Sequence, residues 1–339
     1  MVGKVLNPKY LEWNLEVQQA LGNKTSFSLN YVGNHGYDLF VINPAVNSYS
    51  TAATPLGGLP TAAPYTGFGR VSLLTNAGVS NYHGLTGSVT RRFSLGFTGQ
   101  LNYTWSHALD DVSNGGINPY SLNDSVLAQI NPYCLRCQNY SNADYDVRHN
   151  LTANYVWDLP FKANRGFVNR LISSWTLSGT FFWHTGYPFS AFDLQAPITS
   201  ALVHNGSTDT ILGTFLGGPV APCTSPYHNC LSQSQFAPVA SETVFGNVAR
   251  NFFRGPSYFN SDLSILKNIP ITERFRFGIG ATAYNVFNHP NFANPTGDIS
   301  SGQFGQIVST VTPPTSPYGA FVGSAVSGRI LQLQGRLTF

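Results

Sequence analysis

Residues 10–31 read YLEWNLEVQQALGNKTSFSLNY, and this stretch decides the fold. Apolar side chains occupy every second position from Leu11 to Val17, with polar side chains between them. After a turn at residues 22–24, the same alternation runs from Phe27 to Tyr31. A period of two gives a strand one apolar and one polar face, and a short turn joins two such strands into an antiparallel hairpin. The stretch therefore predicts a hairpin that separates an apolar from a polar surface.

The same pattern recurs in segments of about ten residues, a length that crosses a bilayer as a tilted strand. Aromatic residues gather toward the strand ends, as at Tyr103 and Trp105 or at Trp175 and Trp183, where amphipathic rings lie at membrane interfaces. The pattern predicts an all-β fold of about nine antiparallel strands. They fall near residues 10–20, 25–31, 82–92, 97–106, 149–157, 175–183, 259–265, 275–283 and 331–339.

The expected connections are strongly unequal in length. Short turns near 21–24, 93–96 and 268–272 and a moderate one near 159–172 alternate with long loops. This asymmetry is typical of a transmembrane β-barrel, which has short periplasmic turns and long extracellular loops. The long loops are expected near residues 42–78, 108–143, 186–256 and 288–327.

The composition excludes several other classes of protein. Only 10% of the 339 residues are charged, against about 25% in a typical soluble chain, while aromatic residues make up 14%. The 33 Gly and 21 Pro residues argue against a disordered chain, a coiled coil and a helical bundle. A net charge of +3 without a Lys/Arg cluster argues against nucleic acid as a partner, and no apolar stretch is long enough for a membrane-spanning helix.

The last expected strand alternates apolar residues up to an aromatic carboxy terminus, with Leu331, Leu333, Leu337 and Phe339 in this pattern. It resembles the terminal strand of bacterial outer-membrane proteins, which ends in an aromatic residue that the barrel-assembly machinery recognises. With the last strand ending in the periplasm, an odd number of strands makes the first one start outside the cell, whereas a complete bacterial barrel has an even number. Since residues 1–10 also lack the apolar core of a signal peptide, we expect residues 1–339 to be the carboxy-terminal part of a longer barrel.

The four cysteines fall in two close pairs, within stretches rich in Gly, Pro, Asn and Ser. Disulfides that cross-link loops are the favoured interpretation, ahead of a metal site, a redox pair or free thiols, and they imply an oxidising compartment. Four cysteines allow three pairings, among which the sequence does not choose. The residues are Cys134, Cys137, Cys223 and Cys230.

Several motifs follow one another along the chain: Asn7-Pro8 followed by Trp13-Asn14-Leu15 and Val17-Gln18, Asn81-Tyr82-His83-Gly84-Leu85, Tyr103-Thr104-Trp105-Ser106, Tyr145-Asp146-Val147-Arg148-His149 and Phe287-Asn288-His289-Pro290-Asn291-Phe292. In their order and spacing they resemble TonB-dependent outer-membrane receptors of the Oar-like type, which carry a carboxypeptidase-regulatory-like domain ahead of the plug. The resemblance implies a barrel of about 22 strands, of which this is the last part, and an energised importer that is a monomer. The TonB box, plug and regulatory-like domain are absent here, so the TonB complex would act only through the missing part.

The leading hypothesis is a receptor in the bacterial outer membrane whose long loops, especially 186–256, capture a large extracellular ligand. A passive porin-like channel and a secreted soluble β protein, acting as an adhesin or glycan binder, are the alternatives. No catalytic motif, cofactor or metal site is recognised, so an enzyme is not expected. His83, His149 and His289 are interpreted as wall, interface or turn residues, and Asp144 and Asp146 as capping a turn rather than holding a cation.

Overall fold

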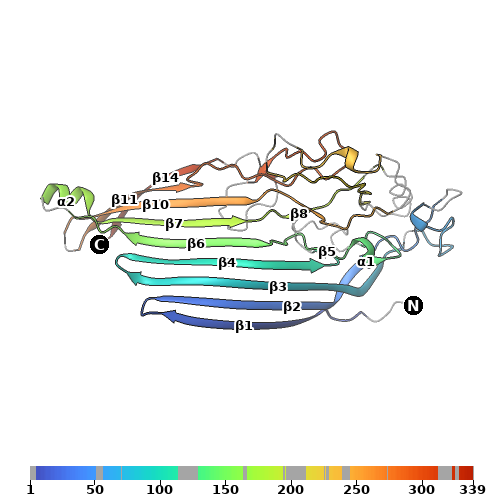
Figure 1. Cartoon of the computed structure of the whole chain (residues 1–339), viewed down its shortest axis with the longest axis horizontal. Helices are drawn as coiled ribbons and strands as arrows, with labels where there is room; N and C mark the ends of the chain where they lie inside the picture. Colours follow the sequence, from blue (N-terminus) through green and yellow to red (C-terminus); the bar gives the residue numbers. More distant parts are fainter. Residues whose placement is uncertain are drawn as a thin grey trace.

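The computed structural model describes most of the chain, with gaps mainly in the long connections. Nine strands follow one another in a single open sheet, each antiparallel to the next (Figure 1). They are β1 Lys9–Leu21, β2 Thr25–Asn43, β3 Leu73–Ser94, β4 Phe97–Asp110, β6 His149–Asp158, β7 Trp175–His184, β10 Tyr258–Pro270, β11 Arg276–Tyr284 and β14 Ile330–Thr338. The described residues are 5–50, 56–69, 71–113, 129–162, 166–193, 195, 211–224, 226, 229–238, 245–272, 274–311, 323–324 and 328–338.

The predicted fold class and the nine strands are confirmed, but several strands are longer than expected, above all β2 and β3. β2 continues to Asn43 and β3 begins at Leu73, so both ends of the loop expected at 42–78 belong to the sheet. The pairing of β2 with β3 shifts its register on either side of Leu39, and Asp38 has a φ of 57°. Such irregularities break the period of two, which is why the alternation in the sequence does not mark these extensions.

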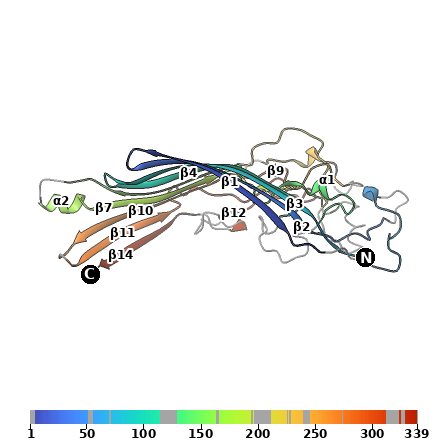
Figure 2. The same cartoon turned by 90° about the horizontal axis from the view of Figure 1, so that it is seen from below.

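The strand register divides the sheet into two faces. One row runs from Val17 through Leu29, Gly87, Tyr103, Leu151 and Trp183 to Phe259. The adjacent row, on the opposite face, runs from Glu16 through Asn30, Thr86, Thr104, Asn150 and His184 to Tyr258. Figure 2 shows that the sheet is curved rather than flat. One face is therefore a continuous apolar surface and the other is polar and mostly uncharged.

Within the described part of the chain, no segment packs as a layer on the apolar face. Leu15 is 68% exposed and Leu333 is 85% exposed, and leaving each such side chain in water costs about 1.5 to 3 kcal/mol. Trp175 and Trp183 on β7 stand eight positions apart on this face, or about 26 Å of extended strand, which matches the apolar band of a tilted membrane strand. None of the helices within the described residues is long and apolar enough to span a bilayer.

The connections are sorted between the two ends of the strands, as predicted (Figure 1). The turns after β1, β3 and β10 lie at one end, which we call the turn end, together with α2 Gly166–Ile172. The long connections lie at the other end, which we call the loop end. β1 and β14 form the two edges of the sheet, and both run from the loop end to the turn end.

The buried apolar core lies in the connections at the loop end rather than in the sheet. Eleven buried side chains from the 186–256 loop and from residues 299–304 form one cluster, which includes Leu212, Phe236, Phe253, Ile299 and Phe304. We call the part of the chain around this cluster the cap. The short elements at the loop end are η1 Leu56–Gly58, α1 Leu135–Gln138, β5 Ser141–Asn142, β8 Pro188–Phe189, η3 Gln233–Gln235, β9 Phe253–Arg254, β12 Thr310–Val311 and β13 Gly323–Ser324.

Candidate functional site

A buried ionic network connects the cap to the sheet. Arg250 forms ion pairs with Asp110, the last residue of β4, and with Asp144, 2.8 Å from its carboxylate. It also donates to the Ser113 hydroxyl over 3.0 Å. The side chains of Arg250 and Asp110 are only 13% and 3% exposed. Burial raises the pKa of Asp110, and the charge of Arg250 opposes that effect.

Two further arginines, Arg148 and Arg254, converge on Asp146, which is fully buried. Arg148 donates to its carboxylate over 2.9 Å, and Arg254 forms an ion pair with the same oxygen. The other oxygen of Asp146 accepts the backbone N–H of Ala108 over 2.7 Å. We call Asp110, Asp144, Asp146, Arg148, Arg250 and Arg254 the loop clamp. Because breaking a buried ion pair costs about 3 to 5 kcal/mol, the loop clamp fixes the end of the 186–256 loop to β4 and to the start of β6.

The loop clamp shows what two of the predicted residues do. The sequence suggested that Asp144 and Asp146 cap a turn or hold a cation. Asp146 does close a turn, since its backbone N–H donates to Ala143, but the cations that both carboxylates hold are guanidinium groups. The sequence does not mark Arg250 and Arg254, because their acidic partners lie 106 to 140 residues away.

Both cysteine pairs are joined within themselves. Cys134, just before α1, forms a disulfide with Cys137 within this helix. Cys223 forms a disulfide with Cys230, and both residues belong to the core of the cap. The 186–256 loop, favoured in the sequence as the ligand-binding segment, is therefore in its described parts a folded and cross-linked layer over the loop end.

A mouth pocket of about 690 Å³ opens on the polar face at the loop end, where β1 to β4 meet Tyr145. Two rows of paired residues form its floor. The pocket has room because small residues alternate with large ones in these rows. The ring of Tyr10 lies over Gly36, where an added Cβ would come within 2.8 Å of a ring carbon. The rows are Glu12, Asn34, Tyr82 and Ala108, and Tyr10, Gly36, Ser80 and Asp110.

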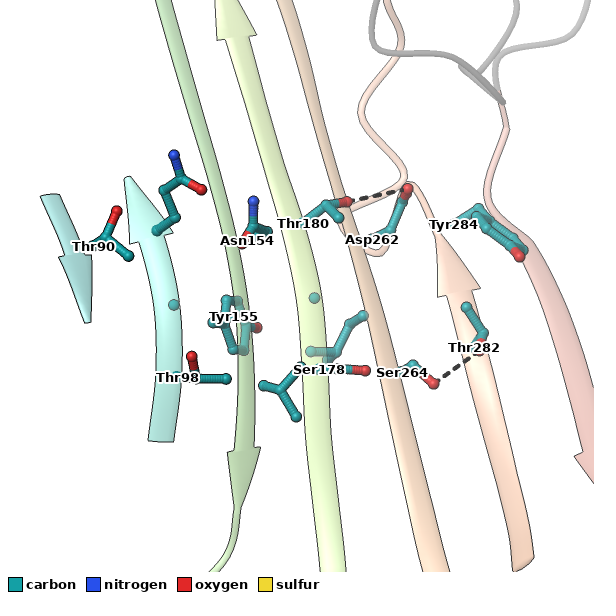
Figure 3. A pocket seen from close by; sticks show the side chains of 15 residues that line it. Thr90, Thr98, Asn154, Tyr155, Ser178, Thr180, Asp262, Ser264, Thr282 and Tyr284 are labelled. Atoms are coloured by element: carbon teal, nitrogen blue, oxygen red, sulfur yellow. Dashed lines mark hydrogen bonds between the residues drawn. The ribbon is translucent and has the colours of Figure 1, made fainter. Parts of the chain in front are cut away.

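A wall groove of about 490 Å³ lies further toward the turn end, across β3 to β11 (Figure 3). Hydroxyl and amide side chains line it, and Ser264 accepts a hydrogen bond from Thr282 over 3.0 Å. Asp262 is the one charged residue among those that line the groove, and it accepts hydrogen bonds from Asn260 and from the backbone of Asn285, each 2.9 Å long. The groove offers a polar wall with a single charged residue among its lining.

The three histidines interpreted from the sequence as wall, interface or turn residues lie on or beside the apolar face. The ring of His83 is hydrogen-bonded to the hydroxyl of Tyr31 over 2.9 Å, and that of His149 to Tyr103 over 2.7 Å. His289 follows β11 and packs edge-on against Phe259. Within the described ranges, no three His, Cys, Asp or Glu side chains gather as a metal site.

Three of the four residues of the predicted assembly signal lie within the described part of the chain. Leu331, Leu333 and Leu337 lie on β14 and share the apolar face with Ala281 and Phe277 of the neighbouring strand. Phe339 lies outside the described residues.

This chain belongs to the outer membrane beta-barrel domain family, which matches residues 3–332. The protein is therefore located in the bacterial outer membrane. Its turn end faces the periplasm and its loop end the outside of the cell, as in other barrels of this kind. None of the curated proteins matches the chain.

Two solved structures match almost the whole chain. The outer membrane transporter YddB from Escherichia coli is 12% identical, with a TM-score of 0.49, over 98% of this chain and 33% of its own. A mutant of the ferric enterobactin receptor PfeA from Pseudomonas aeruginosa is 12% identical, with a TM-score of 0.42, over 98% of this chain and 31% of its own. The chain thus spans about a third of the length of either structure.

Proposed function

We propose that the chain is the carboxy-terminal part of the barrel of a TonB-dependent receptor of the Oar-like type, which takes up a large extracellular ligand. The observation that carries the proposal is the folded cap, which the loop clamp holds over the extracellular end of the polar face. An open channel needs no such layer with its own core and disulfide. A receptor needs one, because a ligand is captured by groups that are already in place.

The edges of the sheet support a longer barrel. β1 and β14 leave their outer hydrogen-bonding groups unpaired, and open edges are not viable in lipid. Both edges run in the same direction, whereas neighbouring strands in a bacterial barrel are antiparallel. Further strands between them would satisfy both requirements, and a plug would then fill the lumen behind the wall groove.

The proposed receptor would have lipid and protein partners but no catalytic activity. The apolar face would contact outer-membrane lipid, and the terminal strand with Leu331, Leu333, Leu337 and Phe339 would be read by the barrel-assembly machinery. The TonB complex would act through the amino-terminal part. The receptor would be a monomer, with no enzymatic activity, no cofactor and no nucleic acid partner.

The test compares three strains of the producing bacterium: one lacking the gene, one lacking TonB, and one whose gene has residues 196–244 replaced by a Gly/Ser linker. This replacement removes Cys223, Cys230 and much of the cap but keeps Arg250 and Arg254. Mass spectrometry of the spent medium identifies the compounds that each strain no longer removes. All three strains should lose the same compounds, while the linker variant still assembles in the outer membrane and shows heat-modifiable migration.

The outcomes separate the alternatives. Continued uptake without TonB would replace the proposal by the porin-like channel, which should also give stable conductance in planar bilayers. Uptake that survives loss of the cap would show that the 186–256 loop does not capture the ligand. A stop codon and a ribosome-binding site immediately upstream of the Met1 codon would contradict the longer barrel.

A further inference from the structure

The mouth pocket carries the chemistry of a specific site. Among the residues that line it, the charged ones are Glu12 and Asp110, and neither lysine nor arginine is present. Asp110 is already neutralised by Arg250 and accepts from Ser113 over 2.7 Å. Glu12 is exposed, and the one partner of its carboxylate among the described residues is the Asn34 amide at 2.9 Å. Glu12 thus brings an uncompensated negative charge to the pocket.

Three tyrosines line the pocket together with Glu12. Tyr10 lies on β1 and is 57% exposed, Tyr82 lies on β3, and Tyr145 lies in the turn before β6 and is 49% exposed. The face of an aromatic ring is negative and attracts cations. Partial desolvation, together with the charges of Asp110 and Asp144, raises the pKa of Tyr145 to about 12. The phenol therefore stays neutral, and further negative charge is disfavoured there.

We infer that the mouth pocket binds a compact organic cation, such as the substituted ammonium group of an extracellular ligand, with Glu12 as the counter-charge and Tyr10, Tyr82 and Tyr145 as the aromatic walls. A volume of about 690 Å³ accommodates a small organic molecule rather than a bare ion. An anionic group finds no lysine or arginine among the lining residues and is repelled by the Glu12 carboxylate. The assignment deepens the proposed receptor function by naming a ligand class for the extracellular mouth.

The probe for this inference is choline, tested on the full-length protein purified from the outer membrane in detergent. Its control is the neutral isostere dimethylbutanol, in which carbon replaces the charged nitrogen. Isothermal titration calorimetry should detect saturable binding of choline and at least tenfold weaker binding of the isostere. Acetate and inorganic phosphate should not bind.

Two variants locate the site. Glu12→Gln keeps an oxygen for the Asn34 amide but removes the charge, and it should weaken choline binding about tenfold. Tyr82→Leu should weaken it by a similar factor through loss of a ring face. The matched control is Glu16→Gln, which changes a carboxylate on the same strand and the same face, four residues from Glu12 and outside the pocket. It should leave binding unchanged.

Several results would overturn the inference: equal binding of choline and its neutral isostere, binding of glucose or maltose in place of choline, no choline binding, or equal effects of Glu12→Gln and Glu16→Gln. Heat-modifiable migration of each variant shows that it is folded. Because binding is measured without transport, loss of the TonB-dependent uptake would not affect this result. A failed choline titration would in turn leave the receptor function standing.

Discussion

Replacing Arg250 by methionine should release the cap from the sheet. The substitution removes both ion pairs of this guanidinium and leaves the carboxylate of Asp110, 3% exposed, without its cation. Breaking such a buried pair costs about 3 to 5 kcal/mol. Since each 1.4 kcal/mol is a factor of about ten, opening of the cap should become roughly a hundred to several thousand times more frequent.

Native-state hydrogen exchange, read by mass spectrometry on the protein in nanodiscs, measures this opening. Amides of residues 245–256 should exchange faster by that factor, while those in β7 and β10 should not change. Adding Asp110→Asn to the Arg250 variant removes the buried charge and should restore part of the protection, which a double-mutant cycle quantifies.

Lys9→Met is the matched control for this experiment. Lys9 also pairs with an aspartate, Asp38, at 3.2 Å, but its side chain is 56% exposed, so its loss should cost no more than about 1 kcal/mol. If Arg250→Met changes exchange near residue 250 no more than Lys9→Met does near residue 38, the loop clamp does not hold the cap and the argument fails.

Three further predictions concern the wall and the cap. Burial raises the pKa of Asp111 above its ordinary 3.8. The stabilising contribution of Asp111 to the free energy of unfolding is therefore complete below pH 3.8 and is lost as the pH rises through the raised pKa. Asp111→Asn should thus slow local hydrogen exchange at pH 7 and change nothing at pH 3. Leu263→Arg places a charge on the apolar face and should lower the free energy of unfolding by about 2 to 4 kcal/mol, measured by urea unfolding in lipid vesicles. An equal loss for Ser264→Arg, on the polar face, would contradict the assignment of the two faces. Opening the Cys223–Cys230 disulfide, which spans seven residues, should cost about 2 to 3 kcal/mol of local stability, measured as faster proteolysis of the cap but not of the strands.

The sheet could be predicted from the sequence because each strand carries its own information. The alternation from Leu11 to Val17 depends only on which face of one strand meets lipid, so it is visible without knowing the neighbouring strand. Where the strand geometry changes, that information is lost. The register shifts around Leu39 hide the outer parts of β2 and β3, which is why the sequence pattern predicts a loop there.

The site could be predicted only in part. Close pairs such as Cys223 and Cys230 are visible because the partners lie near each other in the sequence. The pairing of Arg250 with Asp110 spans 140 residues, and no local pattern marks either residue. The mouth pocket was missed for the same reason: Glu12 looks like one more polar residue of its strand until the register places Tyr82 beyond Asn34.

The position of the apolar core supports the receptor interpretation over a simple channel. A barrel wall needs no core of its own, because lipid covers one face and water or a plug the other. The buried side chains of the cap, such as Leu212 and Phe236, therefore do nothing for the wall. Ordering a long connection costs about 1 to 2 kcal/mol of backbone entropy per residue, and the core and the loop clamp offset that cost. A chain that fixes its extracellular loops in this way gains a preorganised surface at the mouth, which is of use in binding a ligand and of none in passive diffusion.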